Sequence, residues 1–427
     1  MRWLPHRIRL AALVFCICAA GTQASAQPPP AAALDAAAMR QFTSQYEAGL
    51  AALNQNQLAE AAAAFQAASA AQPTNTLPIL GLADVAWRRG QPDVAETEIR
   101  RAMQVGWGTI PPLHALARLL AATGRVDHAI NIYREIIALD PETVSARIDL
   151  ADILHGARQD PGAAVPLYRE ALARASNHAG ARYALGNALL RLGRFDEARA
   201  ELRTATEASP GNPLPLQSLA VLEMRANQPA AALVALDRAL AMRPQSVEIM
   251  VERGGVLLVL GRPEPALAAF RTALSSAPDA ISARLGSGQA LQALNRKAEA
   301  DQAYAAVLQR DAGNVIALNN RAWLAAEDRR DLEQAEAWAT RAAALAPGSG
   351  SVKATLGWVY RARGRLPEAA AALEAATATD ATPDMLVMLG TVYLEQNRRA
   401  DAANAARRAL ILDPGHVAAR ALRNRTS

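Results

Sequence analysis

Few residues of this chain have the types and the spacing that catalysis or metal binding requires. Asp152 and His155 lie three residues apart on one predicted helix, and His114 occupies a comparable place earlier in the chain. Two imidazoles and a carboxylate are a ligand set that zinc uses. Singly placed polar residues on a helix face are far commoner, so we predict no metal site and no cofactor.

A second candidate is the stretch PGSGSVKAT, residues 347–355, which is faintly similar to a phosphate-binding loop. Its spacing departs from the phosphate-loop pattern, and no strand precedes it. No set of nucleophile, base and orienting group can be assembled from the sequence either. We therefore predict that the chain is not an enzyme.

The composition favours helices as the elements that position the side chains. The chain has 427 residues, of which 51% are hydrophobic but only 4% aromatic. Alanine and leucine supply most of the apolar residues, and both favour helices, while the aromatic residues that favour strands are scarce. The composition predicts an all-α protein.

The first residues have the pattern of a secretory signal peptide, which we assign to residues 1–26. Basic residues precede an apolar run at 10–21, and Ala24 and Ala26 fit the small-residue positions of a cleavage site. We expect cleavage before Gln27 and a periplasmic or secreted protein. A retained anchor is the alternative, although the apolar run is short for a membrane span.

Removal of residues 1–26 changes the chemistry of the chain. Both cysteines, Cys16 and Cys18, lie in this segment, so the mature chain forms no disulfide. The formal charge falls from +5 to about +2 when three arginines leave. This weak charge gives no reason to expect nucleic acid as a partner. We read residues 27–41 as a tether rich in Pro and Ala, and we expect no membrane span after it.

A pattern of about 34 residues repeats from residue 42 to residue 416. Unit 179–212 carries Gly186, Gly193, Ala198, Leu202, Ala205 and Pro210. The next unit places Ala220, Asn227, Ala232, Leu236, Ala239 and Pro244 at the same points. Eleven units follow one another: 42–75, 76–109, 110–143, 144–178, 179–212, 213–246, 247–280, 281–314, 315–349, 350–382 and 383–416.

Each unit predicts a pair of helices. Apolar residues recur at helical spacing, a Gly or Asn near the middle marks a helix end in left-handed geometry, and a Pro often closes the unit. One hairpin buries little surface alone, so stability must come from stacking successive units.

This pattern resembles the tetratricopeptide repeat family, whose unit is a helix-turn-helix of 34 residues. The resemblance implies a right-handed α-solenoid of about eleven units. The pattern departs locally at 158–161 and near Ala326, which each carry one extra residue, and at 106–108, where GWG replaces the Pro. Residues 417–427 are then a C-terminal capping helix.

The resemblance also implies that the first helices of the units line a groove that holds a partner. Aromatic and arginine side chains are typical of interface centres, although a solvated polar face is an alternative interpretation. Trp323 and Trp358 occupy the same place in consecutive units, either as a stacked ledge or as simple packing. The candidate partner-binding residues are Tyr46, Trp87, Arg88, Arg118, Tyr183, Asn187, Arg191, Arg225, Trp323 and Trp358.

We interpret the chain as an exported scaffold that binds proteins or peptide segments in its concave groove, during assembly of an envelope complex. The partners would be envelope or secretion components. The arginines of the N-terminal half favour an acidic or C-terminal peptide segment as the ligand. An accessory subunit of an exopolysaccharide synthesis and export machine is the alternative, and a regulatory arm of an enzyme is a third interpretation.

Overall fold

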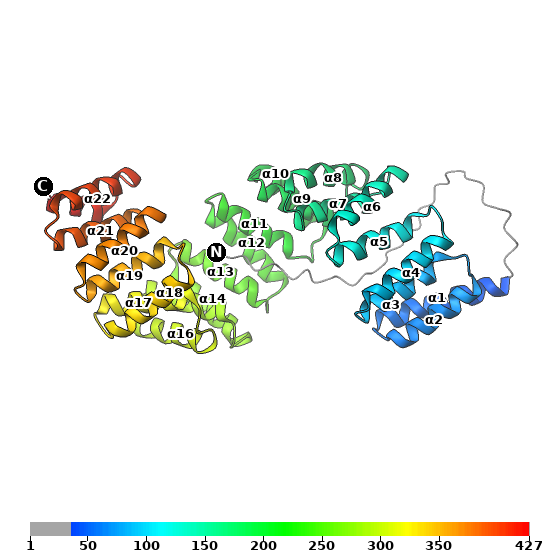
Figure 1. Cartoon of the computed structure of the whole chain (residues 1–427), viewed down its shortest axis with the longest axis horizontal. Helices are drawn as coiled ribbons and strands as arrows, with labels where there is room; N and C mark the ends of the chain where they lie inside the picture. Colours follow the sequence, from blue (N-terminus) through cyan, green and yellow to red (C-terminus); the bar gives the residue numbers. More distant parts are fainter. Residues whose placement is uncertain (1–35, 427) are drawn as a thin grey trace. The chain divides into compact units, whose positions relative to one another are not determined.

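The computed structural model describes residues 36–426, and the elements in this range are α-helices (Figure 1). The chain divides into two compact units, with the boundary between Ser209 and Pro210. The first unit contains α1 Ala36–Asn54, α2 Leu58–Ala71, α3 Thr76–Arg88, α4 Pro92–Val105, α5 Ile110–Ala122, α6 Val126–Leu139, α7 Ser145–Gly156, α8 Pro161–Arg174, α9 Ala179–Arg191 and α10 Phe195–Ala208.

The second unit continues the same order of paired helices. It contains α11 Leu214–Arg225, α12 Pro229–Met242, α13 Val247–Val259, α14 Pro263–Ser276, α15 Ile281–Ala293, α16 Lys297–Arg310, α17 Val315–Asp328, α18 Leu332–Leu345, α19 Gly350–Ala362, α20 Leu366–Thr379, α21 Pro383–Glu395, α22 Arg399–Leu412 and α23 Val417–Thr426. The prediction of an all-α solenoid is confirmed.

The predicted tether ends earlier than the sequence suggested. We assigned residues 27–41 to it, but α1 begins at Ala36. Residues 36–41, AAAMRQ, have high helix propensity, and they extend the first helix of the predicted unit 42–75 toward the N-terminus. The predicted signal peptide and residues 27–35 lie outside the described residues.

The turns inside the helix pairs explain the Gly and Asn positions. These residues have positive φ, the left-handed geometry that ends a helix and that Gly and Asn adopt most readily. They are Asn56, Gly90, Gly124, Gly193, Asn227, Gly261, Asn295, Gly364 and Asn397. The two units of 35 residues differ at this turn. In unit 144–178 the residue with positive φ is Gln159, and in unit 315–349 the residues with positive φ are Arg329 and Asp331.

One buried residue at the eighth position of each second helix fills the space beside the first helices. We call these residues the core column. They are Phe65, Ile99, Tyr133, Tyr168, Leu202, Leu236, Phe270, Tyr304, Ala339, Leu373 and Ala406. All of them are buried, so this column forms the continuous core that stacking of repeats requires.

The size of the core-column residue must match the first helices on either side. The ring of Phe270 lies against Gly254 of α13 and Gly286 of α15, where an added Cβ would come within 2.6 and 2.3 Å of ring atoms. The smallest members are alanines, and Ala339 packs with Ala322 of α17 and Val359 of α19. A small side chain at this point leaves room for α17 and α19 to approach each other.

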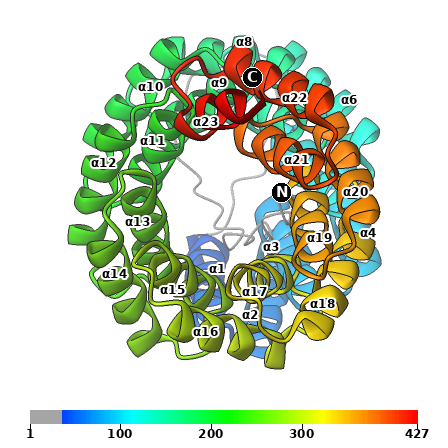
Figure 2. The same cartoon turned by 90° about the vertical axis from the view of Figure 1, so that its left-hand side faces the viewer.

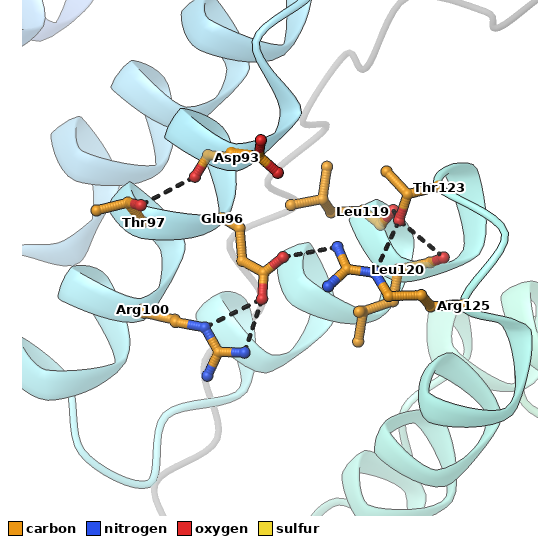
Figure 3. A network of polar contacts seen from close by, with 8 residues as sticks. All are labelled: Asp93, Glu96, Thr97, Arg100, Leu119, Leu120, Thr123 and Arg125. Atoms are coloured by element: carbon orange, nitrogen blue, oxygen red, sulfur yellow. Dashed lines mark hydrogen bonds and ion pairs between the residues drawn. The ribbon is translucent and has the colours of Figure 1, made fainter.

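Ion pairs reinforce the stacking on the side of the second helices. Glu96 of α4 accepts hydrogen bonds from Arg100 at 3.1 and 2.7 Å, and it pairs with Arg125, which precedes α6, at 2.6 Å (Figure 3). Hydrogen bonds from Arg125 and then from Arg100 lower the pKa of Glu96. Thr123 accepts from Arg125 in turn, which fixes the guanidinium between neighbouring helix pairs.

Within the second unit, the odd-numbered helices α11 to α21 lie on the inner side of the curve, and α12 to α22 lie outside them (Figure 2). We use the term inner face for the surface formed by the first helices of the pairs. None of the helices between residues 36 and 426 combines the length and the apolar character that a membrane crossing needs.

Candidate functional site

The inner face of the first unit carries a group of interacting titratable side chains around α7. We call it the α7 cluster. Its members come from α5, α6, α7 and α8, and they are His114, Arg118, Tyr133, Asp149, Asp152, His155 and Tyr168. The two tyrosines belong to the core column, so the α7 cluster joins the buried core to the inner face.

Asp149 is held by groups from two neighbouring helices. The Tyr133 hydroxyl donates a hydrogen bond to Asp149 Oδ2 at 3.1 Å, and His114 Nε2 lies 3.3 Å from the same oxygen. Arg118 Nε lies 3.8 Å away. The His114 and Tyr133 rings meet edge to face with centroids 5.5 Å apart. This arrangement fixes the carboxylate and leaves Arg118 half-exposed beside it.

Asp152 contacts α8, whereas Asp149 contacts the preceding helices α5 and α6. The Tyr168 hydroxyl donates to Asp152 Oδ1 at 2.5 Å. The neighbouring helices shield part of the carboxyl group from water, and this desolvation raises the pKa of Asp152 to about 6. The hydrogen bond from Tyr168 opposes the rise, and the charge of Asp149 adds to it. Asp152 nevertheless remains exposed to solvent, so a ligand can reach it.

The histidines of the α7 cluster favour their neutral forms. Burial lowers the pKa of His114, Asp149 opposes this effect, and Arg118 adds to it. Burial also lowers the pKa of His155, and Arg191 contributes in the same direction. The Nδ1 atom of His155 is buried without a hydrogen-bond partner among the described residues. Within residues 36–426, no group of three or more His, Cys, Asp or Glu residues has a geometry that could hold a metal ion.

Two of the arginines predicted to bind a partner are engaged within the fold. Arg88 donates to the carbonyl oxygen of Leu53 at 2.8 Å and pairs with the buried Asp84 at 3.4 Å. Arg191 donates to the carbonyl oxygen of His155 at 3.0 Å and also to Gln159. These bonds join successive helix pairs and occupy guanidinium N–H groups that would otherwise be available to a ligand.

The other predicted residues of the first unit differ in surroundings. Tyr46 stacks on Phe42 at 5.7 Å and borders a cavity of about 90 Å³ that Asp84 also lines. Burial raises the pKa of the Tyr46 hydroxyl. Trp87 packs against the buried core between α3 and α7. Tyr183 and Asn187 are both half-buried on α9.

In the second unit, Trp323 of α17 and Trp358 of α19 stack with ring centroids 5.9 Å apart and planes inclined by 15°. Of the two interpretations of this pair, a stacked ledge or simple packing, the structure shows stacking. Arg361 Cζ lies 4.3 Å from the Trp358 ring centroid, and Glu395 of α21 accepts from Arg361 Nε at 3.0 Å. We call Trp323, Trp358 and Arg361 the Trp stack. Arg225, the remaining predicted residue, is exposed at the end of α11.

The polar environment of the Trp stack includes one unsatisfied group. Asn319 Oδ1, one turn before Trp323 on α17, is buried without a hydrogen-bond partner among the described residues. The amide nitrogen of Asn319 donates weakly to Asn320 at 3.3 Å. A buried side-chain carbonyl oxygen without a donor is costly, so Asn319 lowers the local stability of α17 beside the Trp stack.

Sequence reasoning missed the partners that hold these side chains. Asp149, Tyr133, Tyr168 and Arg361 were not among the candidate residues, although each contacts one of them or a neighbour on the same helix. The spacing of tyrosine and aspartate in the sequence could have revealed two of these contacts. Each Tyr–Asp pair joins residues 16 positions apart, one at the eighth position of a second helix and the other on an adjacent first helix.

Sequence models described as tetratricopeptide repeat match almost all of the described chain. One model matches residues 46–104, 218–281, 285–350 and 355–417. Two others match 156–222 and 111–153. No curated protein matches the chain in sequence.

Solved structures share the fold at low sequence identity. The Cut9–Hcn1 hetero-tetramer of the APC/C is 13% identical, with a TM-score of 0.50 over 90% of this chain and 96% of that one. A tetratricopeptide repeat protein from Parabacteroides merdae is 21% identical, with a TM-score of 0.50 over 58% of this chain and 98% of that one. At these identities the likeness is one of fold.

Proposed function

Because this chain belongs to the tetratricopeptide repeat family, we propose that it is a scaffold that binds segments of partner proteins along the inner faces of its two units. The fold itself is consistent with a protein-binding scaffold. The proposal places the scaffold in the cell envelope, where it would help to assemble a complex. The apolar run at 10–21 followed by Ala24 and Ala26 supports export.

The observation that supports the inner face most directly is the exposed carboxylate of Asp152. Its position is fixed by the buried Tyr168, so a ligand meets a preorganised acceptor. Arg118 and the half-buried Tyr183 on neighbouring first helices add a donor and an aromatic surface. Interface centres are enriched in these residue types.

The first unit favours a different ligand from the acidic segment that the sequence suggested. Arg88 and Arg191 are already bonded within the fold, whereas Asp152 has no cation within ion-pair distance among the described residues. We propose that the segment presents a hydrogen-bond donor, such as a lysine or arginine side chain, to Asp152. A charged donor strengthens a hydrogen bond to a carboxylate.

Photo-crosslinking in intact cells tests this proposal. A benzophenone amino acid at Tyr183, on the inner face, should capture a partner that is recovered in the periplasmic fraction. The same group at the exposed Arg203 of α10 should capture little. Adding Asp152→Lys to the Tyr183 probe should lower the yield by about tenfold, because like charges repel across an interface.

Equal yields from the two probe positions would contradict binding at the inner face. Recovery in the cytoplasm alone would contradict the envelope assignment and leave the binding result standing. Circular dichroism of the Asp152→Lys protein serves as a folding control, because the change also removes the hydrogen bond from the buried Tyr168 and should weaken the first unit without unfolding it.

A further inference from the structure

A small cavity lies on the inner face of the first unit, where α1 and α3 pack together. Its volume is about 90 Å³, and eight of its nine lining residues carry no charge. Leu53, Phe65 and Leu80 are buried and form its floor, whereas Tyr46 is half-buried and Pro111, at the start of α5, is exposed. The cavity is therefore apolar inside and can be reached from the surface at Tyr46 and Pro111.

Two glycines keep this space free. The ring of Phe65 lies against Gly49 of α1 and Gly81 of α3, where an added Cβ would come within 2.6 and 2.8 Å of ring atoms. Neither glycine has a side chain that could extend over the ring, and Gly81 lines the cavity itself. The opening between α1 and α3 is thus a product of the sequence of both helices.

Asp84 is the charged member of the lining, and its surroundings favour an uncharged ligand. Its side chain is 1% exposed, and Arg88 Nε lies 3.4 Å from Asp84 Oδ1. Burial raises the pKa of this carboxyl group, while Arg88 and then Arg118 of α5 lower it. Two guanidinium groups thus compensate one carboxylate. A further cation gains little here, and an anion inside the cavity would lose its hydration next to a carboxylate.

The size of the cavity selects among uncharged side chains. An apolar cavity of about 150 Å³ in another protein holds a benzene molecule. At about 90 Å³, this cavity is too small for an aromatic ring. It matches a branched aliphatic group of about three or four carbon atoms, such as the side chain of valine or leucine. Burial of such a group typically raises affinity by about tenfold or more.

We propose that this cavity binds one valine or leucine side chain of the partner segment. This assignment rests on the proposed function, because the ligand is taken to be a segment of a protein. The aliphatic side chain supplies affinity by leaving water, and the cationic donor at Asp152 determines which segment binds. The first unit thus recognises a segment that carries both an aliphatic and a basic residue.

Disulfide exchange at a cysteine beside the cavity tests this preference without a partner protein. The mature chain, residues 27–427, contains no cysteine, so Pro111→Cys introduces a single thiol at the border of the cavity. The variant is equilibrated in a redox buffer with equal amounts of 3-methylbutanethiol, 2-aminoethanethiol and phenylmethanethiol. Mass spectrometry of the intact protein gives the ratio of the mixed disulfides. Ala173→Cys, on the exposed side of α8, gives the ratio away from the cavity.

The branched alkyl group should be preferred at the cavity. Relative to Ala173→Cys, the Pro111→Cys protein should favour the 3-methylbutyl disulfide over the aminoethyl disulfide by about tenfold, because several aliphatic carbons leave water. Adding Leu77→Trp, which places an indole in the cavity lining, should abolish this excess. Leu50→Phe fills the cavity from α1 and should have the same effect. Circular dichroism shows whether each filled variant is folded.

Equal ratios at the two cysteine positions would refute the proposal, as would an excess that persists in folded variants with a filled cavity. A preference for the aminoethyl disulfide would show that Asp84 binds a cation, and a preference for the phenylmethyl disulfide would show that the cavity takes an aromatic ring. Either result would overturn the aliphatic assignment and leave the cross-linking result at Tyr183 standing. Conversely, a tenfold excess without cross-linking would contradict the protein segment as ligand and keep the chemistry of the cavity.

Discussion

The α7 cluster and the Trp stack occupy the same repeat positions and present opposite chemistry. Arg118, Asp152, Trp323 and Trp358 all stand at the ninth position of their repeat units, which begin at residues 110, 144, 315 and 350. In the α7 cluster this position carries charge, and the hydroxyl of the core-column residue Tyr168 holds Asp152. In the second unit it carries indoles that stack on one another. The backbone pattern is shared, so the difference arises from the side chains behind the inner face.

The core column accounts for this difference. Tyr133 and Tyr168 are large, fill the space between first helices, and place a hydroxyl within reach of Asp149 or Asp152. Ala339 is small, and α17 and α19 come close enough for their tryptophans to stack. The size of the core-column residue thus goes together with the surface at these two places, whereas Tyr304, which contacts the neutral Gln292, shows that a tyrosine in the column does not by itself place charge on the inner face.

The substitution with the largest expected effect is Ala339→Tyr. A tyrosine at this fully buried position should force α17 and α19 apart, separate the two indoles and lower the free energy of unfolding by about 3 kcal/mol through overpacking. Ala337→Tyr, two residues earlier and exposed, is the matched control and should cost under about 0.5 kcal/mol. Chemical denaturation with tryptophan fluorescence measures both. Equal losses would mean that the core column does not set the helix spacing.

Tyr168→Phe tests the role of the tyrosine hydroxyls in the α7 cluster. It removes the hydroxyl that holds Asp152 and keeps the ring, so we expect a loss of about 1.5–3 kcal/mol, the usual value for a hydrogen bond to a charged group. The pKa of Asp152 should rise further, since the hydrogen bond from Tyr168 now lowers it. Tyr304→Phe is the control, because its hydroxyl contacts the neutral Gln292 at 3.2 Å. NMR titration of the Asp152 carboxyl carbon would read the pKa, and an unchanged value would contradict the role given to Tyr168.

The smallest expected effect is the contribution of Asp152 to the change of the unfolding free energy with pH. The pKa of Asp152 is raised to about 6 in the folded protein, above its value in an unfolded chain. The folded state therefore binds the proton more tightly, and Asp152 adds stability as pH falls from 7 toward 5. His114 and His155 act in the opposite direction, since their pKa values are lowered.

Comparison with Asp152→Asn isolates the carboxyl group from the histidines. Relative to this variant, the wild-type protein should gain stability between pH 7 and pH 5, by less than about 1 kcal/mol because solvent screens the exposed carboxylate. Denaturation midpoints at the two pH values provide the measurement. A relative loss of stability on acidification would show that the pKa of Asp152 is not raised.

Local features of the fold could be predicted from the sequence, because they depend on neighbouring residues. Left-handed geometry at Gly193 or Asn227 follows from which residues tolerate positive φ. The equivalent positions of Trp323 and Trp358 in consecutive units left two interpretations open, and stacking, one of them, is present in the structure.

The pairing of polar side chains could not be predicted in this way. Whether Arg88 reaches a ligand or the carbonyl oxygen of Leu53 depends on how adjacent hairpins rotate against each other. The same is true of Arg191 and of the tyrosines behind Asp149 and Asp152. These rotations are set by the volume of buried side chains, which a spacing pattern does not report.

The stacking of helix pairs also has a kinetic consequence. Within each unit, a helix packs mainly on the next helix or the next but one, and contacts such as Tyr133–Asp149 and Arg361–Glu395 span 16 and 34 residues. Closing such short loops costs little chain entropy, and chains rich in local contacts fold quickly. Folding can thus start at any hairpin and spread along the array in either direction. A destabilising substitution near one end of the array should therefore unfold only the hairpins at that end. The same substitution in the middle should stop folding from propagating between the two halves.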